Sequence, residues 1–265
     1  MRFSIITPSY NQGAFIERTI RSVLAQEGDF ELEYLVVDGG STDETVAILR
    51  RYEGRLRFVS EPDRGQSDAI NKGFARTTGD VVAWLNSDDL YVPGALAAVA
   101  EGLRTSGARW CFGQCRIIDE NDREIRAGIK RYKEWHGRHY TRRRLFTKDF
   151  IPQPATFFRR EILEHAGGLN PESHLAMDYD LWLRFARIAE PLFIPHDLAA
   201  FRWYLASKSG ANYGKAAWEA FASARKHARG VERFALVEHA LHVVSLTASY
   251  KLLDVVRPVL ERRRS

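Results

Sequence analysis

The feature that most constrains the fold is a regular alternation of short apolar runs and helical patterns in the first half of the chain. Four apolar runs have the length of a buried strand: residues 3–7, 34–37, 56–59 and 81–85. Between them, apolar residues recur every three to four positions, as at Ile16, Ile20 and Val23. Strands that alternate with helices pair into a parallel sheet. The sequence therefore predicts an α/β fold.

Polar clusters follow three of these runs, at the points where the strands end. They occupy residues 7–11, 38–40 and 86–89. In parallel α/β sheets, ligands bind beyond the carboxyl ends of the strands. We therefore expect these distant segments to converge on one edge of the sheet and to form a ligand site there.

The second half of the chain has a different rhythm. Residues 130–148 carry eight basic residues against one acid, Glu134, and predict a long loop with short helices. A strand at Phe157 and Phe158, a helix over residues 178–189 and a helical tail from Lys215 follow. We expect a main domain over residues 1–210, divided into 1–118 and 119–210. A helical C-terminal extension over residues 211–265 follows it and ends in Arg262, Arg263 and Arg264.

The composition excludes several classes of protein. A hydrophobic content of 45% predicts a packed globule, and a net charge of +5 favours phosphate-bearing partners or an anionic membrane surface without requiring nucleic acid. Cys111 and Cys115 are too few for a structural zinc site or a disulfide framework, so we expect core thiols in a reducing cytoplasm. No targeting peptide and no membrane span of ~18 apolar residues is evident, which predicts a soluble or peripheral protein.

The adjacent carboxylates Asp88 and Asp89 carry the first chemical signal. Two acids after a buried strand are costly unless a cation shares them, and Mg²⁺ or Mn²⁺ prefers such oxygen ligands. The alternative is a solvated turn or a helix cap before Pro93, which a lone acidic pair favours. Asp38 ends a neighbouring strand and has the same two interpretations.

Five motifs in order strengthen the first interpretation. They are IITPSYN at 5–11, VVDGGSTD at 36–43, NKG and GD at 71–73 and 79–80, LNSDD at 85–89, and MDYDLWLR at 177–184. This series, which spans about residues 1–205, resembles the family-2 glycosyltransferases. The resemblance implies a GT-A fold, a Rossmann-like α/β/α sandwich with a mostly parallel sheet. It also implies inverting transfer of a sugar from a nucleotide diphosphate, with residues 1–118 binding the donor and 119–210 the acceptor.

The resemblance also implies a role for each matching residue. Those assigned to the nucleotide sugar are Thr7, Pro8 and Tyr10 at the nucleoside, Asp38 at the base edge, Asp88 near the ribose, and Asp68 and Lys72 near the ribose or diphosphate. Asp89 is the expected ligand of Mn²⁺ or Mg²⁺. For Lys72 an ordinary exposed helix lysine is an equal alternative.

Asp178 takes the position of the general base in this resemblance. An inverting displacement needs a carboxylate on the face opposite the leaving group, where it accepts the proton of the acceptor hydroxyl. Asp180, two residues on, is expected to pair with Arg184 instead, at the i+4 position of the helix. For Trp182 we favour core packing over stacking on a sugar.

Two positions depart from the family pattern. Asn86 stands where the first acid of the acidic triplet is usual, and Tyr204 stands where many members have a histidine that joins the metal site. Asp89 then remains as the one side chain expected on the metal. Ser207, Lys208 and Ser209 resemble the loop that closes over the diphosphate.

The predicted function is transfer from a UDP- or dTDP-type donor to a hydroxyl of a bacterial glycan or lipid-linked glycan. A nucleotide- or glycan-binding module and a sugar-phosphate nucleotidyltransferase are the alternatives, and the second lacks its phosphate loop. His239 and His242 are expected on a solvated helix face. The basic C-terminal helices predict contact with the inner face of the cytoplasmic membrane or, alternatively, a partner chain.

Overall fold

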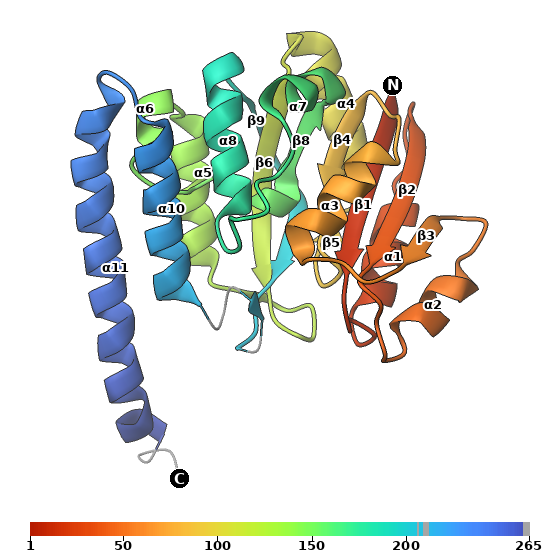
Figure 1. Cartoon of the computed structure of the whole chain (residues 1–265), viewed down its shortest axis with the longest axis horizontal. Helices are drawn as coiled ribbons and strands as arrows, with labels where there is room; N and C mark the ends of the chain where they lie inside the picture. The colour runs from red at the N-terminus through yellow and green to blue at the C-terminus, as the bar shows by residue number, and fades with distance from the viewer. Residues whose placement is uncertain (206, 209–211, 262–265) are drawn as a thin grey trace.

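A computed structural model describes residues 1–205, 207–208 and 212–261, and for Tyr213 and residues 249–261 it describes only the backbone. Figure 1 shows a sheet between layers of helices, with a pair of long helices at one side. The first half contains β1 (Arg2–Ser9), α1 (Ile16–Leu24), β2 (Glu31–Asp38), α2 (Thr45–Arg51), β3 (Arg57–Ser60), α3 (Gln66–Ala75), β4 (Val81–Trp84), β5 (Leu90–Tyr91) and α4 (Ala95–Ser106). The predicted alternation of strands and helices is confirmed.

The second half completes the sheet and adds the C-terminal helices. Its elements are β6 (Trp110–Ile118), β7 (Glu124–Ile125), α5 (Ala127–Arg138), α6 (Arg142–Leu145), η1 (Gln153–Ala155), β8 (Thr156–Arg159), α7 (Arg160–Ala166), α8 (Met177–Ile188), β9 (Leu192–Arg202), α10 (Tyr213–His227) and α11 (Glu232–Glu261). The segment 130–148, for which the sequence predicted a long loop with short helices, consists mostly of α5 and α6. The last three arginines lie outside the described residues.

The sheet is mixed but mostly parallel. Among the described residues it has nine strands, in the order β3-β2-β1-β4-β8-β6-β9-β5, with β7 beside β6. The pairs β1–β2, β1–β4, β2–β3 and β6–β9 are parallel, and β8 runs antiparallel to both β4 and β6. Six strands therefore point the same way, and their carboxyl ends share one edge.

Two hydrophobic clusters fill the two faces of the sheet. Phe3 and Ile5 of β1 belong to one cluster and Ile6 to the other, as the alternation of side chains along a strand requires. Both clusters contain side chains from the covering helices, such as Val23 of α1 and Leu181 of α8. This arrangement is the expected α/β/α sandwich.

A stack of three buried tryptophans fixes α8 against the sheet. The ring of Trp182 lies 5.5 Å from that of Trp84 and 5.9 Å from that of Trp110, nearly parallel to both. Trp182 is fully buried, so its predicted core role is confirmed. At the N-terminus of α8, Ser67 Oγ of α3 lies 2.9 Å from Met177 Sδ. These contacts hold the first turn of α8 beside the first turn of α3.

The helix α3 lies so close to β1 that it has no room for a side chain at Gly73. A Cβ added there would come within 2.4 Å of Ile6 Cγ2. We expect Gly73→Ala to lower the free energy of unfolding by about 1–3 kcal/mol, because the overlap forces a backbone shift. Urea denaturation measures this change.

A matched control is Gly128→Ala in α5, where an added Cβ meets no atom within 4 Å. In that position alanine should leave stability unchanged or raise it by about 0.5–1 kcal/mol. Equal stability of the two variants would contradict the close approach at Gly73.

The C-terminal helices α10 and α11 form an antiparallel pair, and α10 also packs on α8 (Figure 1). Ala224 and Ala235 join the same core cluster as α8. His239 of α11 is buried, with Nδ1 3.1 Å from the carbonyl oxygen of Phe146, so its placement on a solvated face is wrong. No helix in the described part of the chain has the length and apolar character of a membrane span.

Candidate functional site

The polar clusters at the strand ends do converge, through hydrogen bonds between their backbones and side chains. Gly39 N donates to Ser9 O at 2.8 Å, and Asn11 N donates to Ser41 Oγ at 2.7 Å. Thr19 Oγ1 in α1 lies within 2.9 Å of the carbonyl oxygens of both Ser87 and Asp89. The expectation that segments 7–11, 38–40 and 86–89 share one edge is therefore confirmed.

Asp38 organises the loop after β2. Its side chain is fully buried and accepts hydrogen bonds from Gly40 N, from Ser41 N and Oγ, and from Ser60 Oγ. Ser41 is thus bonded to Asp38, and α2 begins four residues later, at Thr45. The structure places Asp38 at the expected strand end with its oxygens already bonded.

The other residues expected at the nucleoside differ in accessibility. Thr7 is buried and its Oγ1 lies 3.1 Å from Tyr34 Oη, and Pro8 is also buried, whereas Tyr10 is 62% exposed. A Cβ added at Gly39 would lie 2.6 Å from Asp63 Oδ2 and 3.4 Å from Tyr10 Cδ2. The exposed ring of Tyr10 therefore stands beside bare backbone at the end of β2.

Asp68 and Lys72 belong to one ion-pair network on α3. Asp68 accepts from Arg64 Nη2 at 2.8 Å, and Arg64 lowers the pKa of Asp68 to about 2. Lys72 Nζ lies 3.4 Å from Asp68 and 3.3 Å from Glu61. Both residues lie next to the loop 61–65, and the ion pairs fix their side chains there without requiring a bound ligand.

Asp88 and Asp89 have different surroundings. Asp89 is fully buried: Oδ1 accepts from Arg202 N at 2.8 Å, and Oδ2 lies 3.3 Å from Asn86 Nδ2. Asp88 is half-buried, and one of its oxygens accepts from Tyr204 Oη at 3.2 Å. Burial raises the pKa of both carboxyls, and the charge of Asp88 raises that of Asp89 further. Such carboxylates favour a bound cation, and Asp88 is the one that solvent reaches.

Arg202, the last residue of β9, supports this pair from inside. Its side chain is fully buried; Nε donates to Asp88 O at 2.8 Å, and the guanidinium pairs with Asp122. Tyr204, two residues on, occupies the place where a histidine was considered and packs on Phe15 with ring centroids 5.2 Å apart. Its hydroxyl therefore reaches the site through Asp88.

Asn86 links the acidic pair to a row of amides. It accepts from Gln66 Nε2 at 2.8 Å, and its own Nδ2 lies 3.2 Å from Gln153 Oε1. Gln66 Oε1 in turn accepts from Lys208 Nζ at 2.7 Å. Asn86 is thus a neutral side chain where the family pattern has an acid. Through Gln66 it links the acidic pair to the ammonium of Lys208 at the same edge. Ser209 lies outside the described residues.

The donor set for a metal is small. No cluster of three or more Asp, Glu, His or Cys side chains suitable for an ion occurs in the part of the chain that the structure describes. The half-buried carboxylate of Asp88 fits an ion that draws most of its ligands from a bound diphosphate and water, as Mg²⁺ and Mn²⁺ do. The residues present therefore fit a divalent ion carried in with a ligand.

Asp178 lies in the first turn of α8, where the helix N-terminus favours a negative charge. Its Oδ1 accepts from Tyr179 N at 2.9 Å. Burial raises the pKa of Asp178, although Lys133 and Lys208 oppose the rise. A carboxylate with a raised pKa is a stronger base, which suits proton abstraction.

A second carboxylate, Asp149, accompanies Asp178 and was missed in the sequence. Water reaches Asp149, but the surrounding protein and the charge of Asp178 raise the pKa of Asp149 to about 7. Lys133 of α5 lowers the pKa of both acids. The only sequence signal was a single acid directly after the basic segment 130–148.

Asp180 has the structural role expected of it. It accepts from Arg184 Nε at 3.0 Å and lies 2.8 Å from His227 Nε2 of α10. Burial by itself would raise the pKa of Asp180, but His227 and Arg184 together lower it. Asp180 therefore anchors α10 to α8 and faces away from Asp178.

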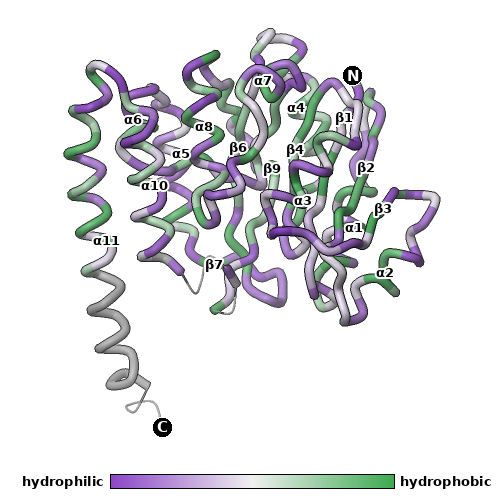
Figure 2. The backbone as a smooth tube through the Cα atoms, in the orientation of Figure 1, coloured by the Kyte–Doolittle hydropathy of each residue, from purple (hydrophilic) through white to green (hydrophobic). Residues whose placement is uncertain are grey.

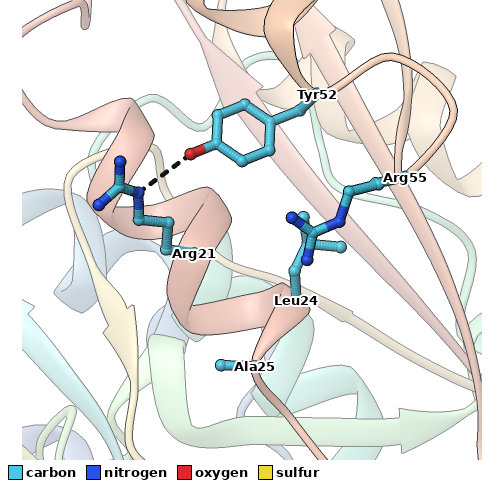
Figure 3. Close-up of a pocket in the computed structure, with 5 residues that line it drawn as sticks. All are labelled: Arg21, Leu24, Ala25, Tyr52 and Arg55. Carbon is cyan, nitrogen blue, oxygen red and sulfur yellow. Dashed lines mark hydrogen bonds between the residues drawn. The ribbon is translucent and has the colours of Figure 1, made fainter.

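A separate hollow of about 390 Å³ lies between α1 and α2 (Figure 3). It is lined by Arg21, Leu24, Ala25, Tyr52 and Arg55, and Arg21 Nε donates to Tyr52 Oη at 3.0 Å. None of the residues at the strand ends lines it. Without a carboxylate or a nucleophile in its lining, it is a poor candidate for the chemical site.

Sequence comparisons identify relatives of the chain. The model of Glycosyl transferase family 2 matches residues 4–167. An uncharacterized glycosyltransferase of Mycobacterium tuberculosis is 34% identical over 203 residues, which cover 75% of this chain and 74% of that protein. A PGL/p-HBAD biosynthesis glycosyltransferase of Mycobacterium bovis is 32% identical over 189 residues, which cover 69% of this chain and 68% of that protein.

Solved structures share the fold at low sequence identity. Staphylococcus aureus TarS, residues 1–349 in complex with UDP-GlcNAc, aligns with a TM-score of 0.67 and 17% identity over 91% of this chain and 72% of that one. The mannosyltransferase PcManGT of Pyrobaculum calidifontis, in complex with GDP-Man and Mn²⁺, aligns with a TM-score of 0.66 and 20% identity over 97% of this chain and 81% of that one. The sheet and its covering helices are thus those of nucleotide-sugar-binding GT-A proteins.

Proposed function

Because the chain belongs to glycosyl transferase family 2 and is a glycosyltransferase, we propose that it moves a sugar from a nucleotide-diphosphate sugar to an acceptor hydroxyl with inversion. The observation that carries this proposal is that two separate groups of carboxylates lie at one edge of the sheet. Asp88 and Asp89 lie in the turn that follows β4, and Asp178 lies in the first turn of α8, beside α3. In a displacement reaction, Asp88 and Asp89 suit the side of the leaving diphosphate, and Asp178 suits the side of the attacking hydroxyl.

The nucleoside is proposed to bind over the ends of β1 and β2. The exposed ring of Tyr10 beside the bare backbone of Gly39 offers a flat surface for a base. Thr7 and Pro8 support this surface from beneath, and Asp38 holds the loop that faces the base edge. Asp68 and Lys72 are proposed to face the ribose or diphosphate from α3.

The divalent ion, Mn²⁺ or Mg²⁺, is proposed to sit on Asp88 instead of Asp89. The accessible oxygen of Asp88 supports this choice, since both oxygens of Asp89 are bonded inside the protein. When bound, the ion would neutralise charge on the leaving diphosphate. Lys208, held by Gln66, adds a cation of the protein itself on the same side.

In the proposed step, the acceptor oxygen attacks the anomeric carbon while the bond from that carbon to the diphosphate oxygen breaks. The electron pair leaves with the nucleoside diphosphate, and the hydroxyl proton passes to Asp178. Placement at a helix N-terminus favours the charged form of Asp178, whereas burial raises its pKa and makes it a stronger base. Asp149 and Lys133 lie close enough to influence its charge.

The acceptor is proposed to be a glycan or lipid-linked glycan that approaches from residues 119–210, with the donor held by residues 1–118. The location of Asp178 and Asp149 outside the donor segment supports this division. The boundary proposed at residues 210 and 211 falls outside the described residues. Work at the inner face of the cytoplasmic membrane is part of the same proposal.

Thermal shift with a panel of nucleotide sugars tests the donor proposal. A specific donor with Mn²⁺ at about 100 times its dissociation constant should stabilise the fold by about 2.7 kcal/mol, which raises the melting temperature by several degrees. UDP-, dTDP- and GDP-sugars are compared with and without Mn²⁺. Absence of a shift with every donor would contradict the proposal, and release of pyrophosphate during turnover would indicate nucleotidyl transfer instead.

A further inference from the structure

The helix α11 presents an apolar stripe on the side opposite its packed face. Ala235, His239 and Val243 face the protein and are buried. The outward stripe consists of Val231, Phe234, Val237, Leu241 and Val244, whose exposed fractions run from 54% at Val244 to 73% at Phe234. Their spacing of three to four residues places them in one row.

This stripe is more extensive than the isolated exposed apolar residues that occur on most protein surfaces. The thirteen residues of α11 up to Val244 span about 20 Å, and a contiguous row of large side chains over that length usually marks an interaction site. Figure 2 shows hydrophobic segments recurring along the described part of α11. In Figure 1, α11 lies at the outer edge of the molecule, and its packed face meets α10, α6 and, through the Arg187–Glu232 ion pair, α8.

The charges of the helix pair distinguish what the stripe can contact. All three acids in residues 213–248 are engaged within the protein. Glu219 accepts from Ser173 Oγ at 2.7 Å, Glu232 pairs with Arg142 at 2.9 Å and also with Arg187, and Glu238 pairs with Arg143 at 2.6 Å. Within residues 213–248, therefore, no acid is left without a partner to offset a cation on the surface.

The cations of the same segment are arranged in the opposite way. Lys215, Arg225, Lys226, Arg229 and Arg233 are all exposed, and no ion pair joins any of them to an acid within residues 1–205, 207–208 and 212–248. Lys215, Trp218 and Arg225 are exposed on α10, where Trp218 is 48% exposed, and Arg229 lies in the turn between α10 and α11. The helix pair therefore carries an apolar row together with unpaired positive charge and an exposed indole.

We propose that the α10–α11 pair is a contact surface for an anionic lipid bilayer. The valine, phenylalanine and leucine side chains of the stripe enter the boundary of the acyl chains, and the unpaired cations bind lipid phosphates. A second copy of the chain fits less well, because it would bring the same unpaired cations against each other. This inference extends the proposed function, since a lipid-linked acceptor would meet the enzyme at that surface.

Vesicle flotation of the full chain tests the proposal. The protein is expected to float with vesicles that contain phosphatidylglycerol, much less with phosphatidylcholine alone, and less at high salt. Phe234→Ser/Leu241→Ser should weaken binding by about tenfold, because two of the largest apolar contacts are lost. Ile129→Ser, an exposed apolar residue on α5, is the matched control and should bind as the unaltered chain does.

Charge variants give an independent measurement. Arg225→Ser/Arg229→Ser should weaken binding to the anionic vesicles by about tenfold or more, whereas Arg50→Ser/Arg123→Ser, two exposed arginines on other elements, should not. Failure of the unaltered chain to float, or equal binding by all variants, would overturn the proposal. A dimer in solution that Phe234→Ser/Leu241→Ser converts to monomers would assign the stripe to a second copy.

The donor-induced thermal shift separates this inference from the proposed function. Phe234→Ser/Leu241→Ser should keep the shift of the unaltered chain with a nucleotide sugar, because the stripe is remote from the strand ends. Loss of flotation with an intact shift supports the membrane surface, and an intact flotation without any donor shift would contradict the enzymatic proposal alone.

Discussion

Replacing Asp178 by asparagine is expected to lower the rate of sugar transfer by about 10²–10⁴-fold, because the acceptor hydroxyl then has no carboxylate to take its proton. The same variant should bind donor as before, since the proposed donor residues lie at the ends of β1 and β2, after β4 and on α3, whereas Asp178 lies on α8. Product formation under saturating donor and the donor-induced thermal shift measure the two effects separately. Unchanged turnover would remove Asp178 from the mechanism.

The Asp178→Asn replacement should not lower stability, although it lowers activity. Burial raises the folded-state pKa of Asp178 above its unfolded value, so its contribution to stability is fully present below the unfolded pKa and is lost as the pH rises through the folded pKa. Above the folded pKa the ionised carboxylate therefore costs stability, and asparagine should leave the melting temperature unchanged or raise it. An inactive variant that melts earlier would point to misfolding instead.

The same raised pKa predicts the acid limb of the activity profile. Asp178 must be ionised to accept a proton, so transfer should fall at a higher pH than for an ordinary carboxylate. Lys133 lowers the pKa of Asp178, and Lys133→Met should shift this limb further toward neutral pH. If activity fell at the same pH in both proteins, Lys133 would have no effect on the pKa of the general base.

Asp180→Asn is the matched control for Asp178→Asn, because it makes the same chemical change two residues further along α8. It weakens the contacts of Asp180 with Arg184 and His227, which join α8 to α10. We expect lower stability but nearly full turnover per folded molecule. The control therefore separates loss of the base from loss of the helix.

The second large effect is expected at Asp88. Asp88→Asn should lower kcat/KM by about 10²–10³-fold, equivalent to about 3–4 kcal/mol of transition-state stabilisation, because the carboxylate proposed to hold the divalent ion is lost. The extra thermal shift that Mn²⁺ adds to a bound donor should disappear. Titration of Mn²⁺ against activity checks this result.

Asp89→Asn provides the comparison. Asp89 accepts from Arg202 N inside the protein, so its replacement should chiefly lower stability and leave the metal dependence in place. If Asp89→Asn abolished the metal dependence and Asp88→Asn did not, the original assignment of the ion to Asp89 would hold.

Much of the fold could be predicted because its signals are local. Strand length, helical spacing and the polar residues after each strand are properties of short segments, and they identified β1 to β4, α8 and the edge that carries Asp38 and Asp88. The core role of Trp182 followed from the same spacing. These predictions needed no knowledge of distant contacts.

The parts that could not be predicted depend on contacts between distant residues. Asp149 lies next to a basic run and gives no periodic signal, yet the fold brings its charge near Asp178. The difference between Asp88 and Asp89 arises because Arg202, more than a hundred residues later, bonds one carboxylate and leaves the other half-exposed. His239 had the spacing of a surface pair but is buried against Phe146.

The bonds of Arg202 also limit how the molecule can move. The strands β4 and β9 are separated in the sheet by β8 and β6, yet the end of β9 is fastened to Asp88 and Asp89 by a buried guanidinium and a backbone N–H. Such a cross-brace resists shear and hinge opening between the two halves of the sheet. We therefore expect the sheet to act as a rigid frame, with movement during the proposed reaction confined to the segments around the strand ends.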